Sequence, residues 1–150
     1  MLNIYYLTII PALIAIFYSV YIIFWLRKQH GGDEKMKEIS SAIRTGAKAY
    51  LNRQYKTVGI VALIISIALY FIFGWLSVLG FLAGAFASAL SGYIGMNIAV
   101  RSNSKTTEAA KSGLSPALSL AFRAGSVTGF LVVALALLAV SLFYFLTRDI

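Results

Sequence analysis

The sequence predicts an all-α integral membrane protein with four transmembrane helices, and three observations lead to this fold class. Sixty per cent of the residues are hydrophobic and only 12% are charged, about half the charged fraction of an ordinary soluble domain. The mean hydropathy is strongly positive. Four long runs carry no charge, and about 20 apolar residues suffice to cross a hydrocarbon core of roughly 30 Å.

The first predicted span covers about residues 4–26 and contains no charged residue. It begins with Tyr5 and is closed by Arg27 and Lys28, and both aromatic and basic residues favour the membrane interface. No positive charge precedes the run and no small-residue cleavage site follows it, so a membrane span is favoured over a secretory signal peptide. Pro11 lies inside the span, where we expect a kink or a neighbouring helix to absorb the lost backbone hydrogen bond.

The charged segment 27–57 becomes helical in pattern from Met36 onward. Apolar residues recur there at spacings of three and four, which places them on one helix face: Met36, Ile39, Ile43, Ala47, Tyr50 and Leu51. This helix could lie on the membrane surface, or it could run directly into the second span. We favour continuation, because neither a proline nor a clear C-capping glycine separates it from Val58.

The remaining elements follow in order along the chain. The second span is predicted at about residues 58–73, and a tight uncharged turn follows at 74–77. The third span is predicted at about 78–100 and the fourth at about 127–146. Between them lies a polar segment, 101–126, which contains Pro116.

The distribution of basic residues predicts how the helices are oriented. Eight Lys or Arg lie in the first connecting segment and four in the third, whereas the turn between the second and third spans has none: Arg27, Lys28, Lys35, Lys37, Arg44, Lys48, Arg53 and Lys56, then Arg101, Lys105, Lys111 and Arg123. Basic segments stay on the cytoplasmic side. We therefore expect 27–57 and 101–126 to be long cytoplasmic loops or segments, with the short turn and both termini extracytoplasmic.

Small residues form two rows along the third span. They recur every four residues, as Gly80, Gly84, Ser88 and Gly92 in one row and as Ala83, Ala87, Ser91 and Gly95 in the other. Such rows let neighbouring backbones approach closely, which is a main means by which helices associate in lipid. The pattern predicts that the third helix is packed on several sides, and that packing faces are exposed if partner helices are absent.

The sequence offers no catalytic constellation. There is no cysteine and only one histidine, His30, so thiolate chemistry and a multi-histidine metal centre are excluded. All five acids lie outside the predicted spans: Asp33, Glu34, Glu38, Glu108 and Asp149. We therefore predict no catalytic, cofactor-binding or metal-ligating residue. A small multidrug exporter, which would need an intramembrane glutamate, is disfavoured.

The net charge of +8 does not indicate a nucleic-acid partner. The basic residues lie beside membrane spans, where they set topology, and they are not interleaved with base-stacking aromatics on a polar surface. The partner that they do predict is the lipid bilayer, whose anionic headgroups attract each basic residue by about 1 kcal/mol near the surface.

Three stretches resemble the start of the membrane-bound, ion-translocating inorganic pyrophosphatases. Residues 36–55 contain Gly46-Ala47-Lys48-Ala49-Tyr50-Leu51 followed by Arg53-Gln54-Tyr55, similar to a helix that leads into that family's second span. Residues 92–110 resemble the end of its third helix, with Lys105 where arginine is more frequent. Residues 121–129 resemble the start of its fourth helix. The three matches occur in the family's order and span most of the chain.

The resemblance implies a large multi-helix bundle in a prokaryotic cell membrane, usually a homodimer, that hydrolyses Mg-pyrophosphate and drives H⁺ or Na⁺ outward. Mg²⁺ is implied for the complete protein and not for any residue in this sequence, because the family's acid-rich helices follow the fourth span. We therefore expect an N-terminal four-helix scaffold that is inactive alone. The alternative is a self-sufficient four-helix membrane structural or assembly protein without catalysis.

Overall fold

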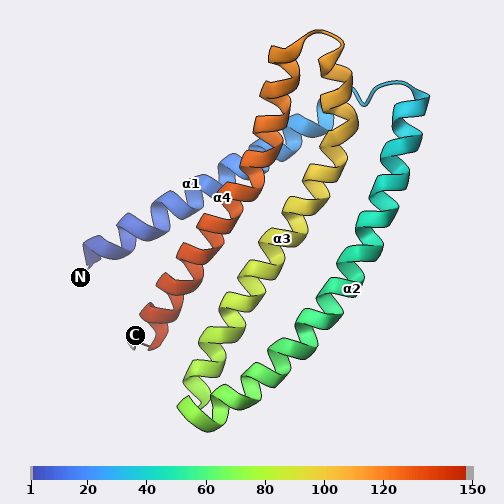
Figure 1. Cartoon of the computed structure of the whole chain (residues 1–150). Coiled ribbons are helices and arrows are strands. Elements are labelled where there is room, and N and C mark those ends of the chain that lie inside the picture. Colours follow the sequence, from blue (N-terminus) through green and yellow to red (C-terminus); the bar gives the residue numbers. More distant parts are fainter. Residues whose placement is uncertain (1, 148–150) are drawn as a thin grey trace.

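The computed structural model describes the backbone of residues 2–147 and the side chains from residue 6 onward. Asp149, one of the five acids, lies outside the described residues. The described chain forms four α-helices, α1 (Leu2–Lys28), α2 (Glu34–Phe73), α3 (Trp75–Ala110) and α4 (Leu114–Thr147) (Figure 1). The prediction of an all-helical chain is confirmed. Each helix contains one predicted span and is long and apolar enough to cross a membrane.

Successive helices run in opposite directions. The α1–α2 and α3–α4 connections lie at one end of the bundle, and the α2–α3 turn lies at the other (Figure 1). Helix α1 is inclined to the other helices, and its start and the end of α4 both lie away from the first end (Figure 1). We call the first end the basic end, because the basic segments 27–57 and 101–126 meet there. Their common placement agrees with the predicted topology. That the basic end faces the cytoplasm stays a prediction.

The basic segments are mainly helical, so the expectation of long loops was wrong. Only residues 29–33 and 111–113 interrupt the helices there, and the prediction that the amphipathic segment continues into the second span is confirmed by the unbroken α2. The physical reason is that helix-compatible residues extend well beyond the apolar runs. Charge marks where the predicted spans end, whereas the helices continue to the next glycine-containing break.

Glycines with positive φ form the tight connections. Gly74 has φ 80° and is the single residue between α2 and α3, and Gly113 has φ 121° just before α4. The predicted turn at 74–77 is thus shorter than expected, since Trp75 already begins α3. Glycine suits both positions because a Cβ disfavours positive φ.

The helices pack in the spatial order α1, α4, α3 and α2. The main apolar cluster lies between α1 and α4 and consists of Ile22, Leu26, Leu120, Ala124, Val127 and Leu131. Pro11 lies inside α1, which remains continuous around it. Within the described chain, the only helix against which α2 packs extensively is α3. Helix α2 therefore forms one edge of the bundle (Figure 1).

The two small-residue rows of α3 have different surroundings. At Gly95 a Cβ would lie 2.6 Å from Thr128 of α4, and at Gly80 it would lie 3.0 Å from the Phe143 ring. Gly84 has nothing within 4 Å and is exposed. Ser88 and Gly92 are also exposed, although a Cβ at Gly92 would lie 3.3 Å from the Tyr55 hydroxyl of α2. The prediction of close packing is therefore right at Gly80 and Gly95, which lie against α4, whereas the stretch around Gly84 and Ser88 is open.

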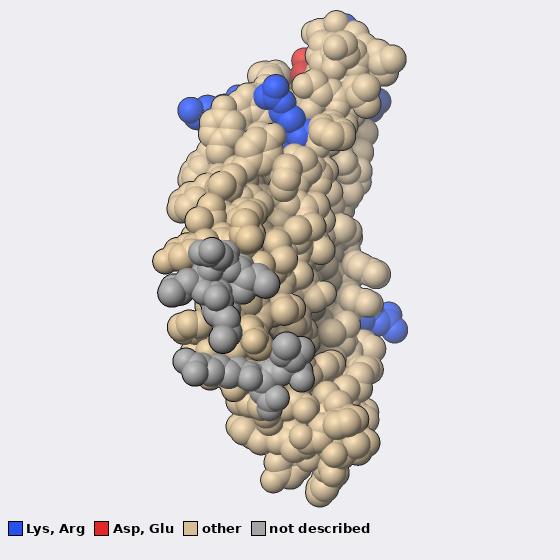
Figure 2. All heavy atoms as spheres, turned by 90° about the vertical axis from the view of Figure 1, so that its left-hand side faces the viewer, with Lys and Arg blue, Asp and Glu red and all other residues tan. Residues whose placement is uncertain are grey.

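Large apolar side chains cover the outside of the bundle. Phe71 and Phe86 are 80% and 70% exposed. Exposing such apolar surface to water is unfavourable, but in a bilayer these side chains contact lipid instead. Figure 2 shows charged side chains gathered mainly towards the basic end, with a broad surface almost free of charge below them. Together with the four apolar helices, this distribution is that of an integral membrane protein.

Candidate functional site

Lys105 of α3 holds the end of α1 at the basic end of the bundle. Its Nζ donates hydrogen bonds to the carbonyl oxygens of Leu26 at 2.8 Å and Gln29 at 2.6 Å, and lies 3.4 Å from that of Arg27. The last carbonyls of a helix lack partners within it, and a cation is favourable there. Burial lowers the pKa of Lys105. The side chain therefore acts as a C-cap supplied from another helix.

A second group of polar contacts fixes the start of α2. Asp33 is its N-cap, and its carboxylate accepts a hydrogen bond of 2.9 Å from the Met36 amide. Lys111 Nζ lies 3.5 Å from Asp33 Oδ2 and 2.7 Å from Glu108 Oε2. The Met36 amide and Lys111 lower the pKa of Asp33, and the hydrogen bond to Glu108 raises the pKa of Lys111. His30 Nδ1 lies 3.9 Å from Glu108 Oε1.

Gly32 lets the α1–α2 connection lie against these groups. It is buried with φ 86°, and a Cβ there would meet the Met36 sulfur and lie 3.3 Å from Glu108 Oε2. A side chain would thus be strained by both the backbone conformation and the lack of space. The connection, α2 and the end of α3 are held together as one unit.

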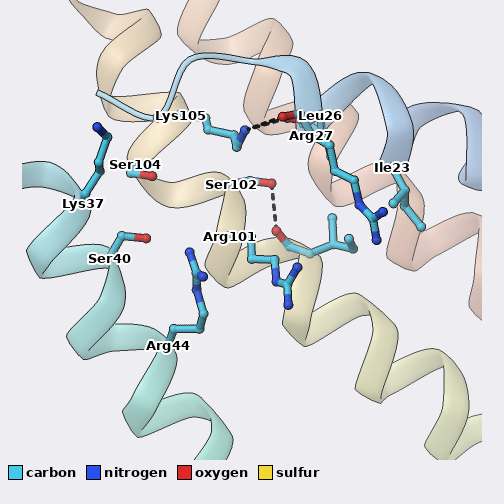
Figure 3. Close-up of a pocket in the computed structure, with 12 residues that line it drawn as sticks. Ile23, Leu26, Arg27, Lys37, Ser40, Arg44, Arg101, Ser102, Ser104 and Lys105 are labelled. Carbon is cyan, nitrogen blue, oxygen red and sulfur yellow. Dashed lines mark hydrogen bonds between the residues drawn. The ribbon is translucent and has the colours of Figure 1, made fainter. Parts of the chain in front are cut away.

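A pocket of about 270 Å³ opens between α1, α2 and α3 just below this unit (Figure 3). Five of its twelve lining residues are basic and none is acidic: Arg27, Lys37, Arg44, Arg101 and Lys105. Serines on α2 and α3 supply hydroxyl groups, and Ile23, Leu26 and Ile98 supply an apolar wall. The pocket therefore combines uncompensated positive charge with hydrogen-bond donors and apolar surface.

The five bases of the pocket are not equally available. Lys105 is occupied by the α1 carbonyls, and Lys37 Nζ pairs with Glu34 at 3.0 Å. Arg44 and Arg101 have no ion pair within residues 6–147, and their guanidinium groups extend into the pocket in Figure 3. Arg27 contacts the Phe24 ring at 5.6 Å and pairs with no described acid. Three arginines are left to receive an anion.

The comparisons with known proteins agree with the resemblance found in the sequence. Residues 13–150, which are most of the chain, match the family described as "Inorganic H+ pyrophosphatase". The chain belongs to this family.

Several curated members of the family are similar to the chain. It is 44% identical over 142 residues to a K⁺-insensitive pyrophosphate-energized proton pump of Methanosarcina mazei, covering 93% of this chain and 21% of that protein. It is 46% identical over 140 residues to such a pump of Moorella thermoacetica, covering 91% and 20%. A putative K⁺-stimulated pyrophosphate-energized sodium pump of Bacteroides thetaiotaomicron is 36% identical over 153 residues, covering 97% and 21%. The chain spans about a fifth of the length of these relatives.

The chain has a basic pocket that sequence reasoning missed. Neither Ser40 nor the arginines were predicted as site residues, because Arg44 and Arg101 are 57 positions apart and were interpreted as topology signals. One signal was available. Arg27 and Arg101 each directly follow a predicted span, so they had to lie near the same membrane interface once the helices alternated in direction.

The acidic residues of the described chain do not fit a magnesium site. Glu34 pairs with Lys37, and both Asp33 and Glu108 contact Lys111, so three carboxylates already have cationic partners. Within the part of the chain that the structure describes, no group of three or more His, Cys, Asp or Glu could hold a metal ion. The geometry of this region suits anions rather than cations.

Proposed function

We propose that this chain is the N-terminal four-helix scaffold of an ion-translocating membrane pyrophosphatase, in which hydrolysis of Mg-pyrophosphate drives H⁺ or Na⁺ outward. The observation that carries the proposal is the match of residues 13–150 to the family together with coverage of only about a fifth of its pyrophosphate-energized pumps. The chain alone is not expected to hydrolyse pyrophosphate.

The open side of α3 supports a scaffold role. Gly84, Ser88 and Gly92 are exposed within this chain, although small residues at this spacing suit close helix contacts in a membrane. Gly80 and Gly95 of the same helix already contact α4 through Phe143 and Thr128. We infer that the open row receives another helix of the pump, and that the pump is a homodimer as the family resemblance implies.

Magnesium and pyrophosphate are assigned to other helices of the proposed pump. Among the described residues, the carboxylates of Asp33, Glu34 and Glu108 are engaged with lysines or with the α2 backbone, so no catalytic step is assigned to them. The contribution of α1–α4 is positional: Lys105 and the α1–α2 connection fix the basic end, and α3 presents a packing face to its neighbours.

Reconstitution with the rest of a relative tests the proposal. The Methanosarcina mazei pump without its matched N-terminal fifth is co-expressed with this chain, and pyrophosphate hydrolysis and proton uptake are measured in membrane vesicles. Activity is expected only when both parts are present. Turnover by the chain alone would refute the inactive scaffold, and failure of the two parts to co-purify would favour the self-sufficient four-helix protein.

A pair of substitutions localises the contact in that experiment. Gly84→Leu is expected to abolish co-purification, because the leucine fills a face that is open in this chain and close-packed in the assembly. Ala68→Leu on exposed α2 adds the same side chain away from the row and serves as the matched control. Equal retention of the partner by both variants would contradict the assignment of the α3 row.

A further inference from the structure

We propose that the pocket between α1, α2 and α3 is a binding site for a phosphate group, held by Arg44, Arg101 and the Ser40 hydroxyl. This site goes beyond the scaffold role and does not depend on pump activity. Its starting point is a charge imbalance, since the lining contains five bases and no acid. Arg44 and Arg101 are themselves exposed, but they line the same pocket without an acidic partner, and an anion there would be attracted by both charges.

Ser40 is the second, independent observation. It is 3% exposed, and its Oγ has no hydrogen-bond partner. The other five buried serines all have one: Ser19, Ser66, Ser91 and Ser102 donate to carbonyls three or four residues earlier, and Ser141 donates to Thr8. A buried hydroxyl without a partner costs free energy, and Figure 3 shows that of Ser40 directed towards the pocket. It is placed to donate to a ligand.

Arginine chemistry indicates which anion fits. A planar guanidinium offers paired N–H donors that match the oxygens of phosphate, and Arg44 and Arg101 approach the pocket from two different helices. Neither has an ion pair among the described residues. Two guanidinium groups and a hydroxyl around one space provide the positive charge and the several donors that a tetrahedral oxyanion requires.

The position of the pocket favours a phosphate on a lipid. Arg27 and Arg101 stand at the ends of the first and third predicted spans, at the depth expected for headgroups. The apolar part of the pocket lining consists of Ile23, Leu26 and Ile98, which belong to those two predicted spans. A phospholipid would contact this wall with its glycerol and upper acyl chain while its phosphate meets the arginines. Free phosphate or pyrophosphate would use the same polar groups without the wall.

Native mass spectrometry of the purified 150-residue chain in neutral detergent tests the site. The probes are dioleoylphosphatidylglycerol, dioleoylphosphatidylcholine, inorganic phosphate and pyrophosphate. For Arg44→Gln/Arg101→Gln, retention of phosphatidylglycerol is expected to fall about tenfold, as for loss of charge-assisted hydrogen bonds. Arg53→Gln/Lys56→Gln removes the same charge from exposed positions of α2, and this control is expected to bind as the unmodified chain does.

Ser40→Ala separates binding from folding. Because the hydroxyl has no partner, the alanine variant should be at least as resistant to thermal unfolding as the unmodified chain, while it retains about threefold less phosphatidylglycerol. Far-UV circular dichroism establishes that the arginine variants are folded. Arg44→Lys/Arg101→Lys preserves charge and is expected to restore part of the binding, because lysine lacks the paired donors.

The two sources of phosphate give different results. Displacement of bound phosphatidylglycerol only by other anionic lipids supports a headgroup site. Binding of pyrophosphate or phosphate without lipid, abolished by Arg44→Gln/Arg101→Gln and not by the control, supports a site for the free anion. Equal loss in both double variants would overturn the proposal, since the attraction would then reflect net charge alone. No loss in either would overturn it as well, since Arg44 and Arg101 would then not hold the ligand.

Discussion

The basic end and the membrane-spanning part of this bundle are held together by different kinds of contact. At the basic end, Lys105 reaches the carbonyl of Leu26, 79 positions away in the sequence, and ion pairs surround Lys111. Within the spans, α3 meets α4 through Gly95 and the Thr128 side chain. Near the interface, water lowers the free-energy cost of placing charged groups. In the hydrocarbon core, packing is the main means by which helices associate.

Helix α2 shows both situations along its length. Its start is fixed to the end of α3 by Asp33 and Lys111, and in its middle the Tyr55 hydroxyl donates a 2.7 Å hydrogen bond to the Ala89 carbonyl. Beyond that point its apolar side chains are mostly exposed, including Ile64 and Phe71. The helix is anchored where polar contacts exist and is open to lipid or further helices elsewhere.

The largest effect is expected where packing alone maintains contact. Gly95→Val should destabilise the bundle by about 3 kcal/mol, because the added carbon atoms meet the stiff, branched side chain of Thr128. Gly84→Val makes the same change in the same helix at an open position and should cost far less. Thermal unfolding of both variants in detergent checks the difference. Similar losses would mean that valine destabilises α3 by itself and that the Thr128 contact is unimportant.

A smaller loss is expected at the basic end. Lys105→Met should cost about 2 kcal/mol, because partly buried carbonyls at the end of α1 lose a charged donor. Lys56→Met, at an exposed position on α2, should be nearly neutral. Unfolding in a denaturing detergent, with hydrogen exchange around residues 26–29, measures both effects. Unchanged exchange in the Lys105 variant would show that water replaces the ammonium fully.

The smallest effect is a pH dependence at the start of α2. The folded-state pKa of Asp33 lies below its ordinary value of 3.8, so its stabilising contribution is present above that value and is lost as the pH falls through the lowered pKa. Hydrogen exchange of residues 34–38, corrected for intrinsic rates, should increase as the pH falls from about 5 to about 2.

Two variants of Asp33 separate its contacts. Asp33→Asn keeps a capping oxygen and should retain most of the protection of the Met36 amide at neutral pH, while its response to acid disappears. Asp33→Ala should lose the protection at every pH. A full acid response in the asparagine variant would assign the titration to another group.

Much of the fold was predictable because membrane spans are a local property of the sequence. The apolar runs, the basic residues after positions 26 and 100, and the periodicity from Met36 to Leu51 gave four helices and the continuous α2. Helix ends were less predictable, since helical residues continue past the spans to Ala110 and resume at Leu114. The open and packed stretches of the small-residue face of α3 could not be separated, because small residues suit either situation.

The sequence by itself determined the class of protein, the alternation of the helices and the family, since hydrophobic length, charge placement and motifs are read along the chain. Only the tertiary structure decided that Lys105 caps α1, that Ser40 is buried without a partner and that Arg44 and Arg101 line one pocket. The physical reason is that a polar group acquires its partners from segments far away in the sequence. Those partners are fixed only when the helices pack.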